Sequence, residues 1–347
     1  MAGATPQARP QGPFVRYVAP RWLPGGHFQT LYAALFAPRP RVRYRRERWD
    51  TPDADFVDVD WLDAPRAESK ERGAVSAPSS AASVPLVVLF HGLEGRSASH
   101  YAHALMARVA ARGWRGAVVH FRGCSGEPNR LPRAYHSGDI EELDWMVRRL
   151  RGVQAVDPLY LVGVSLGGNV LLKWLGERAG DAVGMVTAAA AVSAPVDVMA
   201  CGNALDRGLN LIYTHAFLAS LKKKSLAKLQ RFPDLYDAKR VRAVRTLRAF
   251  DDLVTAPLHG FSGTDDYWTR ASSRPSLSRI AVPTLVLNAR NDPFLPPQAL
   301  PTAGDVSSSV LLDFPEEGGH VGFVSGRYPG HLDWLPRRII EFFEHRH

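Results

Sequence analysis

Six short apolar runs recur along the chain, and their alternation with helix-like segments constrains the fold more than any other feature. Most runs are bounded by Gly or Pro, and their successive residues are apolar, as in strands buried on both faces of a parallel sheet. The runs are residues 84–90, 116–121, 159–164, 182–192, 283–289 and 308–314. Strands that alternate with helices in this way predict an α/β fold with a doubly wound, mostly parallel sheet.

Three segments between or after these runs carry signals typical of helices. Residues 97–113 end at Gly113, a common helix stop, and residues 138–152 have acids in the first turn and arginines in the last. Residues 331–345 form the last predicted helix, with Pro336 near its start. Residues 56–61, FVDVDW, alternate as a member of an antiparallel edge pair does, and the polar, small-residue segment 66–83 is typical of a surface linker.

Residues 196–278 interrupt the alternation, because helical patterns occur there without a convincing strand. We expect this segment to form a helical cap over the carboxyl edge of the sheet, where open α/β sheets bind ligands. The expected organisation is then a flexible tail at residues 1–20, a core built from residues 21–195 and 279–347, and the cap at residues 196–278.

Positive charge is concentrated in two places. The whole chain carries a net charge of +9, and residues 206–250 hold eleven Lys or Arg against three Asp; a second basic run spans residues 39–48. Basic patches are typical of nucleic-acid binding, but no zinc knuckle, RNP motif or helix-turn-helix pattern accompanies these. We therefore expect no nucleic-acid partner. Two interpretations stay open, namely solvated element faces and peripheral contact with an anionic membrane.

Composition excludes several classes of protein. A chain of 347 residues that is 46% hydrophobic buries a large core, and two cysteines, Cys124 and Cys201, are too few for a disulfide framework. The cysteines lack metal-ligand spacing, and no phosphate loop or dinucleotide fingerprint occurs, so we expect neither a metal nor a cofactor. The N-terminal residues offer no apolar stretch for a signal peptide, and the most apolar segment is broken by Pro195 and Asp197. A cytoplasmic location is the resulting expectation.

The segment YLVGVSLGGNVLLKWLG, residues 160–176, joins a predicted strand to a helix-like run through the motif G-x-S-x-G. In this context the motif is typical of a nucleophile elbow, in which a strained turn exposes the Ser hydroxyl at the sheet edge. Gly163 and Gly167 leave room for close packing around the crowded backbone of Ser165. We therefore predict that Ser165 is a nucleophile; the alternative is a Gly-rich turn with an inert serine.

A serine nucleophile requires a base and an acid that orients the base. With this elbow the chain order is Ser, then acid, then His. Asp292 directly follows the apolar run 283–289, and Pro293 prevents the strand from continuing, so Asp292 is the predicted acid. The rival acids all fall in the expected cap: Asp251, Asp252, Asp265 and Asp266.

His320 is the predicted base, because it follows the run 308–314 and a flexible Gly-rich turn at the same edge of the sheet. Of the other histidines after Asp292, His331 begins the last helix, and His345 and His347 lie at the chain end. None of these three positions is suited to reach a nucleophile elbow.

An oxyanion hole requires two backbone N–H groups aimed at the developing charge. One is expected from Leu166, directly after the nucleophile, and the other from Leu93, in the loop after the run ending LFHGLEG. His91 and Gly92 are expected to shape that loop. Three residues in a neighbouring loop are weaker predictions for substrate contacts, with ordinary loop hydrogen bonding as the alternative: Arg122, Tyr135 and His136.

Beyond these elements, the chain resembles the YheT-type hydrolases, bacterial relatives of the mammalian ABHD-type lipases in the α/β-hydrolase superfamily. The resemblance is carried by FHGLEG, GVSLGGN, NARNDPF and GGHVGF, by residues 121–139 and 250–273, and by WLPGGHFQTLYAALF near the N-terminus. It covers nearly the whole chain from about Trp22. The resemblance implies an α/β-hydrolase fold and a carboxylic ester hydrolase with Ser165, Asp292 and His320 as its triad.

The sequence thus favours a cofactor-independent serine esterase that acts on a small-molecule ester or lipid, such as a short- to medium-chain acyl ester or a monoacylglycerol-like lipid. Acyl transfer to an alcohol or thiol by the same triad is an alternative, decided by whether the cap excludes water. A catalytically idle hydrolase fold that binds nucleic acid or anionic surfaces through its basic cap is a third hypothesis, and the salt dependence of DNA binding would identify it.

Overall fold

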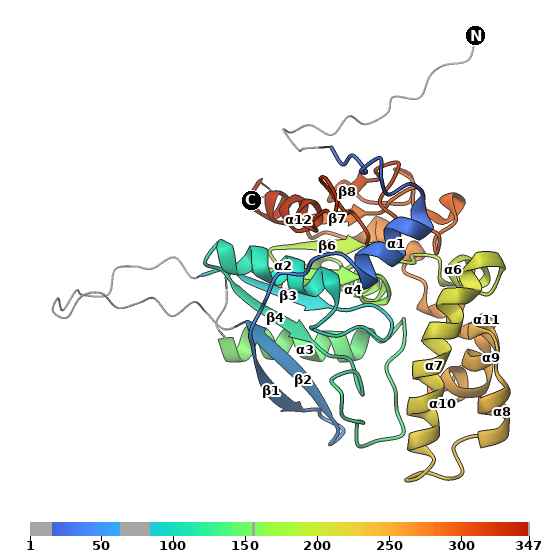
Figure 1. Ribbon diagram of the computed structural model, residues 1–347. Coiled ribbons are helices and arrows are strands. Elements are labelled where there is room, and N and C mark those ends of the chain that lie inside the picture. Colours follow the sequence, from blue (N-terminus) through green and yellow to red (C-terminus); the bar gives the residue numbers. More distant parts are fainter. Residues whose placement is uncertain (1–15, 63–83, 155–156, 346–347) are drawn as a thin grey trace.

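An eight-stranded sheet runs through the centre of the molecule (Figure 1). The computed structural model describes residues 16–62, 84–154 and 157–345. The strand order is β1-β2-β4-β3-β5-β6-β7-β8; β3 to β8 are parallel, whereas β2 is antiparallel to both β1 and β4. The predicted doubly wound, mostly parallel sheet is therefore confirmed. The strands are β1 (Tyr44–Asp50), β2 (Phe56–Leu62), β3 (Leu86–Phe90), β4 (Arg115–Val119), β5 (Leu159–Val164), β6 (Ala188–Val192), β7 (Thr284–Leu287) and β8 (Val310–Asp313).

Each of the six apolar runs coincides with one strand of the parallel sheet, and β4 begins one residue before its run. For residues 182–192 the prediction is wrong in its first half, because a short helix, α5 (Gly180–Val183), and a turn precede β6. The N–H groups of Met185 and Val186 both bond back to the carbonyl of Ala182. This turn uses the first apolar residues of the run, so that only the Ala-rich half extends the sheet.

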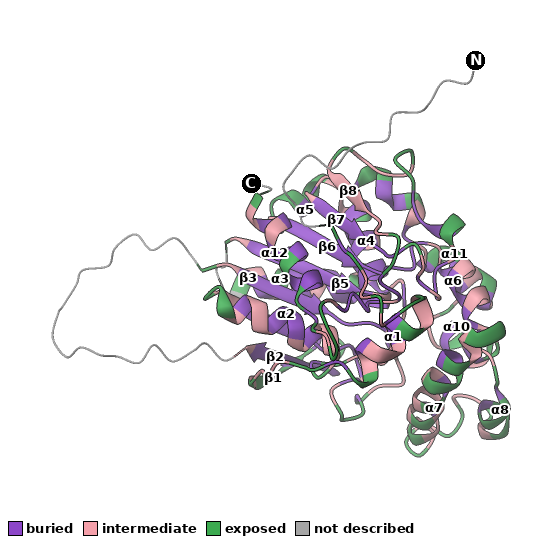
Figure 2. Ribbon diagram, turned by 45° about the horizontal axis from the view of Figure 1, so that its top comes forward, coloured by how far each residue is buried: buried purple, intermediate pink, exposed green. Residues whose placement is uncertain are grey.

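Two helical layers cover the sheet, and Figure 2 shows the buried strands between them. Helices α2 (His100–Ala111) and α12 (Trp334–His345) pack on one face, and α3 (Ile140–Gln154) and α4 (Leu166–Arg178) pack on the other. The side chains of β3 alternate between these two cores, with Val87 and Leu89 on the α2 side and Val88 and Phe90 on the α4 side. The three helices predicted from sequence are confirmed, and Pro336 is the third residue of α12.

Strand β2 belongs to an antiparallel pair at the edge of the sheet, as predicted, and β1 is the outermost strand of that pair. Strand β1 overlaps the second half of the basic run 39–48, which the sequence presented as a charge cluster. Arg46 and Arg48 extend toward the neighbouring strand and bind Asp60 at 2.7 Å and Asp58 at 2.8 Å. Part of this basic run is therefore neutralised by buried carboxylates of β2.

Residues 196–278 contain helices without a strand, and all of them lie in the described part of the chain. They lie beyond the carboxyl ends of the parallel strands (Figure 1) and have an apolar core of their own. We call residues 198–271 the helical segment. It consists of α6 (Val198–Leu205), η1 (Gly208–Asn210), α7 (Leu211–Lys228), α8 (Ala238–Ala243), α9 (Leu247–Phe250), the π-helix η2 (Asp251–Thr255), α10 (Ala256–Leu258) and α11 (Thr264–Ala271).

The remaining elements connect these layers. They are α1 (Gly26–Leu35), η3 (Arg274–Arg279) and η4 (Pro297–Ala299). Among the described residues, no helix has both the length and the apolar character needed to cross a bilayer. The expected linker at residues 66–83 and most of the expected tail at residues 1–20 lie outside the described residues.

Candidate active site

Ser165 occupies a sharp turn between β5 and α4. Its φ of 52° lies in the left-handed region, which non-glycine residues rarely adopt. Its N–H donates to the carbonyl of Val192 at 2.8 Å, and its own carbonyl accepts from the N–H of Asn169 at 3.0 Å. These two bonds fix the strained turn between a strand and a helix, and the side chain stays partly accessible at the sheet edge.

The glycines around Ser165 are required by close backbone contacts. A Cβ on Gly163 would lie 2.5 Å from the carbonyl oxygen of Gly167, and a Cβ on Gly167 would lie 2.4 Å from that of Phe90. Both contacts are with backbone atoms, which cannot rotate away. The helix therefore starts directly against the strands only because these two positions lack side chains.

His320 connects Ser165 to Asp292 through two hydrogen bonds. Its Nδ1 lies 2.8 Å from Asp292 Oδ2, and its Nε2 lies 3.0 Å from Ser165 Oγ. Because a carboxylate only accepts, Nδ1 donates to Asp292, which leaves Nε2 of the neutral ring to accept from the serine hydroxyl. The Asp292 side chain is fully buried, whereas the His320 ring is 11% exposed. The structure thus brings together the three side chains that the sequence predicted as a triad.

The loops that carry Asp292 and His320 are fixed by their neighbours. Asp292 Oδ1 accepts from the N–H of Phe294 at 2.8 Å, and the Phe294 ring stacks on the His320 imidazole with centroids 4.0 Å apart. Behind the histidine, its backbone N–H donates to Thr30 Oγ1 at 2.8 Å. The supporting role of Thr30 was not predicted from the sequence. The only signal for it was the resemblance of residues 22–36 to the YheT-type hydrolases.

The rival residues bind partners elsewhere. Each of the four rival acids forms hydrogen bonds inside the helical segment: Asp251 with Thr255 and Trp268, Asp252 with Thr264, Asp265 with Arg248, and Asp266 with Ser262. Among the histidines, His331 pairs with Asp333 and His345 bonds to a carbonyl of its own helix. His347 lies outside the described residues.

The β3 loop, residues 91–99, lies against the serine. A Cβ on Gly92 would be 3.1 Å from Ser165 Cβ. The Gly92 carbonyl accepts from the N–H of Gly95 at 2.9 Å and from His91 Nδ1 at 2.7 Å. The carbonyl of Gly92 and the N–H of Leu93 belong to one planar peptide and point in opposite directions, so these bonds also orient the Leu93 N–H.

His91 is a neutral donor in this arrangement. It is fully buried, and desolvation lowers its pKa to about 3. Its Nε2 accepts from the N–H of Phe121 at 3.1 Å, so the proton resides on Nδ1, which donates to Gly92. Within the described part of the chain, the N–H groups of Leu93 and Leu166 donate no hydrogen bond. Both amides are thus available to a ligand, as an oxyanion hole requires.

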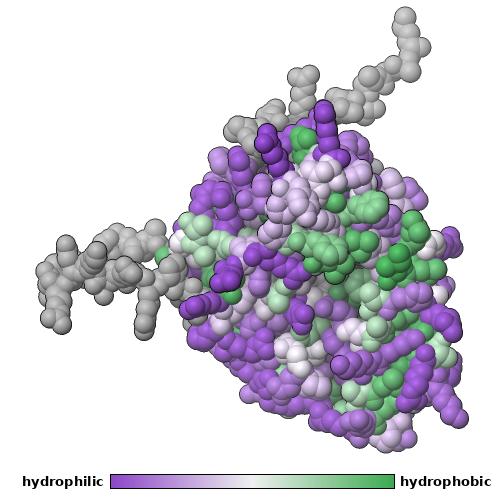
Figure 3. Space-filling view, viewed as in Figure 1, coloured by the Kyte–Doolittle hydropathy of each residue, from purple (hydrophilic) through white to green (hydrophobic). Residues whose placement is uncertain are grey.

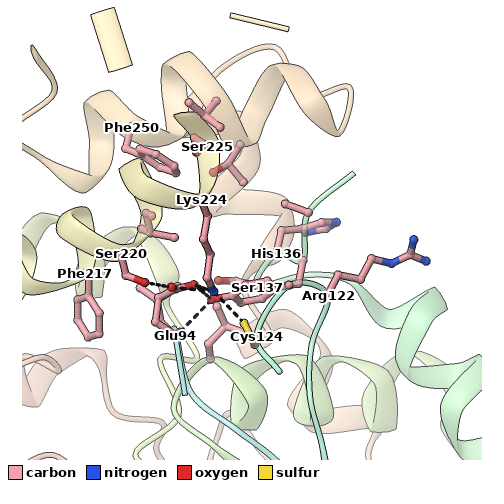
Figure 4. Close-up of a pocket in the computed structure, with 18 of the residues that line it drawn as sticks. Glu94, Arg122, Cys124, His136, Ser137, Phe217, Ser220, Lys224, Ser225 and Phe250 are labelled. Carbon is pink, nitrogen blue, oxygen red and sulfur yellow. Dashed lines mark hydrogen bonds and ion pairs between the residues drawn. The ribbon is translucent and has the colours of Figure 1, made fainter. Parts of the chain in front are cut away.

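The three weaker predictions for substrate contacts have different surroundings. Arg122 is buried, and its guanidinium binds Asp53, Asp55 and Glu142 at 2.8 to 3.1 Å. In Figure 4 its side chain points away from the other labelled cavity residues. Its ion pairs therefore agree with the alternative interpretation, in which these residues only form bonds within the loop. A role for Arg122 in substrate contact stays a prediction.

Tyr135 and His136 both line the cavity described below. The Tyr135 hydroxyl bonds both the backbone and the side chain of Glu94, so it supports the β3 loop. The ring of His136 lies 4.5 Å from that of His259, and burial lowers its pKa to about 4, which keeps it neutral near pH 7. Their contact with a substrate stays a prediction.

A cavity of about 880 Å³ opens beside Ser165, between the sheet loops and the helical segment. The helical segment contributes mainly apolar side chains to its wall, among them Val198, Leu205, Leu247, Phe250, Val254 and Trp268. The free thiols Cys124 and Cys201 also line it, and burial raises the pKa of Cys124 to about 11, so this thiol is neutral. Among the described residues, no group of three or more His, Cys, Asp or Glu side chains could hold a metal ion.

The lysines of α7 differ from the simple pattern of a solvated helix face. Lys222 donates to the carbonyls of Arg242 and Val244, and Lys224 pairs with Glu94 at 2.8 Å. Only Lys223 of this triplet is exposed. The interpretation as a purely solvated helix face therefore does not describe Lys222 and Lys224, because each of them binds a partner outside α7.

Lys228, one turn further along α7, binds the main chain of the loop between β4 and α3. Its Nζ lies 3.0, 2.7 and 2.7 Å from the carbonyl oxygens of residues 131, 132 and 133. The next carbonyl, that of Ala134, lies 2.8 Å from His259 Nε2. Four successive carbonyls of one loop thus face donors of the helical segment.

Comparison with known proteins agrees with this architecture. The chain is 38% identical over 328 residues to YheT of Escherichia coli (strain K12), and the matched region covers 94% of this chain and 92% of that protein. It is 29% identical over 325 residues to the phospholipase ABHD3 of Homo sapiens, and the matched region covers 93% of this chain and 77% of ABHD3. Among solved structures, the esterase Pf2001 of Pyrococcus furiosus superposes with a TM-score of 0.52 at 16% identity, over 87% of this chain and 92% of that chain.

A family model described as the alpha/beta hydrolase fold matches residues 85–326, which is more than half of the chain. Strands in the order found here, followed by a serine on a strand–turn–helix junction, define the same class of protein. The chain belongs to the α/β-hydrolase family, and within it to the branch that contains YheT and ABHD3. The family resemblance predicted from the sequence motifs is therefore confirmed.

Proposed function

We propose that the protein hydrolyses carboxylic esters through an acyl-enzyme formed on Ser165. The observation that carries this proposal is the hydrogen-bonded chain from Asp292 through His320 to Ser165, with distances of 2.8 and 3.0 Å. The names of the relatives agree with the chemistry, because YheT is named as an esterase and ABHD3 as a phospholipase. An esterase or lipase-type activity follows from these relatives, and the roles of individual residues are our proposal.

In the proposed reaction, Ser165 Oγ attacks the ester carbonyl carbon while His320 Nε2 takes the hydroxyl proton. The carbonyl electron pair moves to oxygen, and the N–H groups of Leu93 and Leu166 donate to this oxyanion. The tetrahedral intermediate collapses and expels the alcohol, which receives the proton from Nε2. Water then attacks the acyl-enzyme with His320 again as base. Asp292 keeps Nδ1 protonated and stabilises the imidazolium.

The apolar wall of the cavity supports an acyl chain as the larger part of the substrate. Its volume of about 880 Å³ lies within the range of roughly 300–1,000 Å³ that is usual for small-molecule sites. The helical segment supplies most of the apolar side chains, among them Phe250 and Trp268. We therefore propose that residues 196–278 act as a cap that holds the acyl group, and that medium-chain esters are preferred over acetyl esters.

A series of p-nitrophenyl esters with increasing acyl length, combined with a fluorophosphonate probe, tests this proposal. The wild type should label once per chain, whereas S165A should not label and should lose several orders of magnitude in kcat with little loss of stability. Labelling that persists in S165A would contradict the assignment of the nucleophile. Added glycerol provides a second test, because a glyceride product in place of the free acid would identify acyl transfer.

Peripheral contact with an anionic membrane is a second proposal, supported by the outer surface. Figure 3 shows apolar residues where α1 meets the helical segment, and Phe28, Leu209 and Ile212 are each more than half exposed. Lys239, Arg240 and Arg242 of α8 are exposed cations. Each basic residue near an anionic surface contributes about 1 kcal/mol, and salt screens this attraction.

Vesicle sedimentation at low and high salt tests the membrane proposal. Replacing Lys239, Arg240 and Arg242 by Gln should weaken binding to anionic vesicles at low salt, while turnover of a soluble ester stays unchanged. If the wild type and the triple variant bind anionic vesicles equally, these three cations are ordinary solvated residues and the membrane proposal is wrong. Salt-sensitive binding to DNA by S165A would instead favour the nucleic-acid hypothesis.

A further inference from the structure

The carboxylate of Glu94 links the β3 loop to α7, and Figure 4 shows Lys224 reaching down to it. Glu94 Oε1 accepts from the Tyr135 hydroxyl and from Lys224 Nζ, both at 2.8 Å. The other oxygen, Oε2, accepts from the Ser220 hydroxyl and lies 2.8 Å from Lys224 Nζ. Two residues one turn apart on α7 therefore bind a carboxylate that lies more than 120 positions earlier in the chain.

The backbone of Glu94 is held in a conformation that few non-glycine residues adopt, with φ at 56°. Such a residue persists only where its surroundings fix it. The N–H of Glu94 donates to the Tyr135 hydroxyl at 2.9 Å, and the same hydroxyl donates to the Glu94 carboxylate. The backbone and the side chain of Glu94 are thus tied to one tyrosine.

Leu93 lies between two fixed peptides. On one side, the Gly92 carbonyl is held by His91 and Gly95; on the other, the peptide that joins Leu93 to Glu94 is held by Tyr135. The second anchor depends on the position of Glu94. Because the Glu94 side chain is only 9% exposed, its charge requires a cation nearby, and Lys224 supplies it.

We propose that Glu94 and Lys224 are positioning residues, so that the Leu93 N–H reaches the oxyanion only while α7 is seated on the β3 loop. Neither side chain is required to touch the reacting atoms. The pair makes catalysis depend on the placement of the helical segment, which also lines the cavity. This inference rests on the proposed function, since it requires Leu93 to be an oxyanion donor.

The test uses the full chain with K224M, E94Q, K224R and the double variant E94Q/K224M. Fluorophosphonate titration gives the concentration of active sites, so kcat refers to folded enzyme only. For p-nitrophenyl butyrate, kcat of K224M and of the near-isosteric E94Q should fall about 10- to 100-fold, less than the ~10²–10³-fold loss of a whole oxyanion donor. KM should change by less than about twofold, because ground-state contacts are retained.

Three comparisons separate positioning from a general loss of structure. K224R keeps the cation and should retain most of the activity, and R245M removes an exposed cation of the helical segment that lies outside both proposed sites and should behave as wild type. The double variant should be no slower than the slower single variant, because the two residues act as one unit. A trifluoromethyl ketone, which forms a hemiketal oxyanion on Ser165, should lose affinity in K224M by the same factor as kcat/KM, whereas the corresponding methyl ketone should bind unchanged.

If the wild type is active and K224M has the same kcat and the same affinity for the trifluoromethyl ketone, this inference is overturned, while the proposed function stands. Loss of affinity for both ketones to the same extent would also overturn it, because that result indicates a damaged cavity. A wild type that neither labels nor hydrolyses esters would overturn the proposed function and the inference together.

Discussion

The backbone N–H of His320 donates to Thr30 Oγ1 at 2.8 Å, across 290 positions of the chain. Thr30 lies in α1, and its hydroxyl in turn donates to the carbonyl of Gly26 at 2.6 Å. Next to His320, Gly319 adopts a φ of 60°, and a Cβ there would lie 2.6 Å from the Gly26 carbonyl oxygen. The loop that carries the histidine therefore rests directly on α1.

Replacing Thr30 by Val should leave the His320 N–H without an acceptor. An unsatisfied buried N–H costs about 1–3 kcal/mol, so we expect a loss of that size in the free energy of unfolding. A shifted imidazole should also lower kcat, by about tenfold or more, since small misplacements of catalytic groups are costly. Urea unfolding and steady-state kinetics measure both effects. T30S keeps the hydroxyl and should behave as wild type; equal loss in T30S would contradict the hydrogen-bond explanation.

Asp292 is expected to act through His320. D292N should fold, because Asn can still accept from the Phe294 N–H, but it should lose the orientation and charge support of the ring. The expected loss in kcat is up to ~10⁴-fold, as in triads generally. Steady-state kinetics on D252N and D265N provide the comparison, since both acids bind partners in the helical segment. If kcat falls further in D252N or D265N than in D292N, Asp292 is not the catalytic acid.

The close packing at Gly167 predicts a large effect of a single methyl group. In G167A the new Cβ would meet backbone oxygens of Phe90 and His91 at 2.4 and 2.6 Å, and neither can turn aside. We expect a loss of about 1–3 kcal/mol or more in the free energy of unfolding, together with loss of fluorophosphonate labelling. The matched control is G152A in α3, where nothing lies within 4 Å of the new Cβ. This variant should gain about 0.5–1 kcal/mol in urea unfolding.

Asp251, in the cavity wall, predicts a specific pH dependence of stability. Desolvation raises its pKa from 3.8 to about 6. Because the folded value lies above the unfolded one, the protonated carboxyl stabilises the fold fully below about pH 4, and this contribution is lost as the pH rises through 6. The stability of the wild type relative to D251N should therefore fall between pH 4 and 7, by on the order of 3 kcal/mol.

The neighbouring Asp252 supplies a control of opposite sign. Hydrogen bonds from Thr264, first from its backbone N–H, lower the pKa of Asp252. Because the folded value lies below the unfolded value of 3.8, its contribution is present in full above about pH 4 and is lost only at lower pH, so D252N should lose the same amount of stability at every pH from 5 to 8. Urea unfolding from pH 4 to 8 measures both variants. Parallel curves for the wild type and D251N would refute the assigned shift.

Local sequence signals predicted the sheet and the elbow because these depend on short segments. The apolar runs around Val88 and Leu161 specify buried strands by themselves, and Ser165 is recognised from the strand before it and the helix after it. Strand β1 was not predicted, because its arginines are typical of a charged surface until Asp58 and Asp60 are placed opposite them. Pairing across strands is information that a single segment does not contain.

The same limit applies to the candidate site. Asp292 and His320 follow apolar runs at the sheet edge, so their order in the chain was enough to predict them. Thr30 contacts His320 across 290 positions and Lys224 contacts Glu94 across 130 positions, and no local sequence pattern predicts these contacts. Charge alone was consistent with a solvated face for Lys224, whereas in the folded chain its ammonium group pairs with the largely buried carboxylate of Glu94 at 2.8 Å.

The bonds from Lys228 and His259 to the carbonyls of residues 131–134 make no use of the side chains in that loop. Every amino acid carries a backbone carbonyl, so this contact does not restrict which side chains occupy the four positions, and the attachment of α7 and of His259, directly after α10, is preserved through changes there. Lys228 has no such freedom, since a replacement must reach the same oxygens with several donors. Natural variation should therefore accumulate on the loop side of this contact and be sparse on the side of the helical segment.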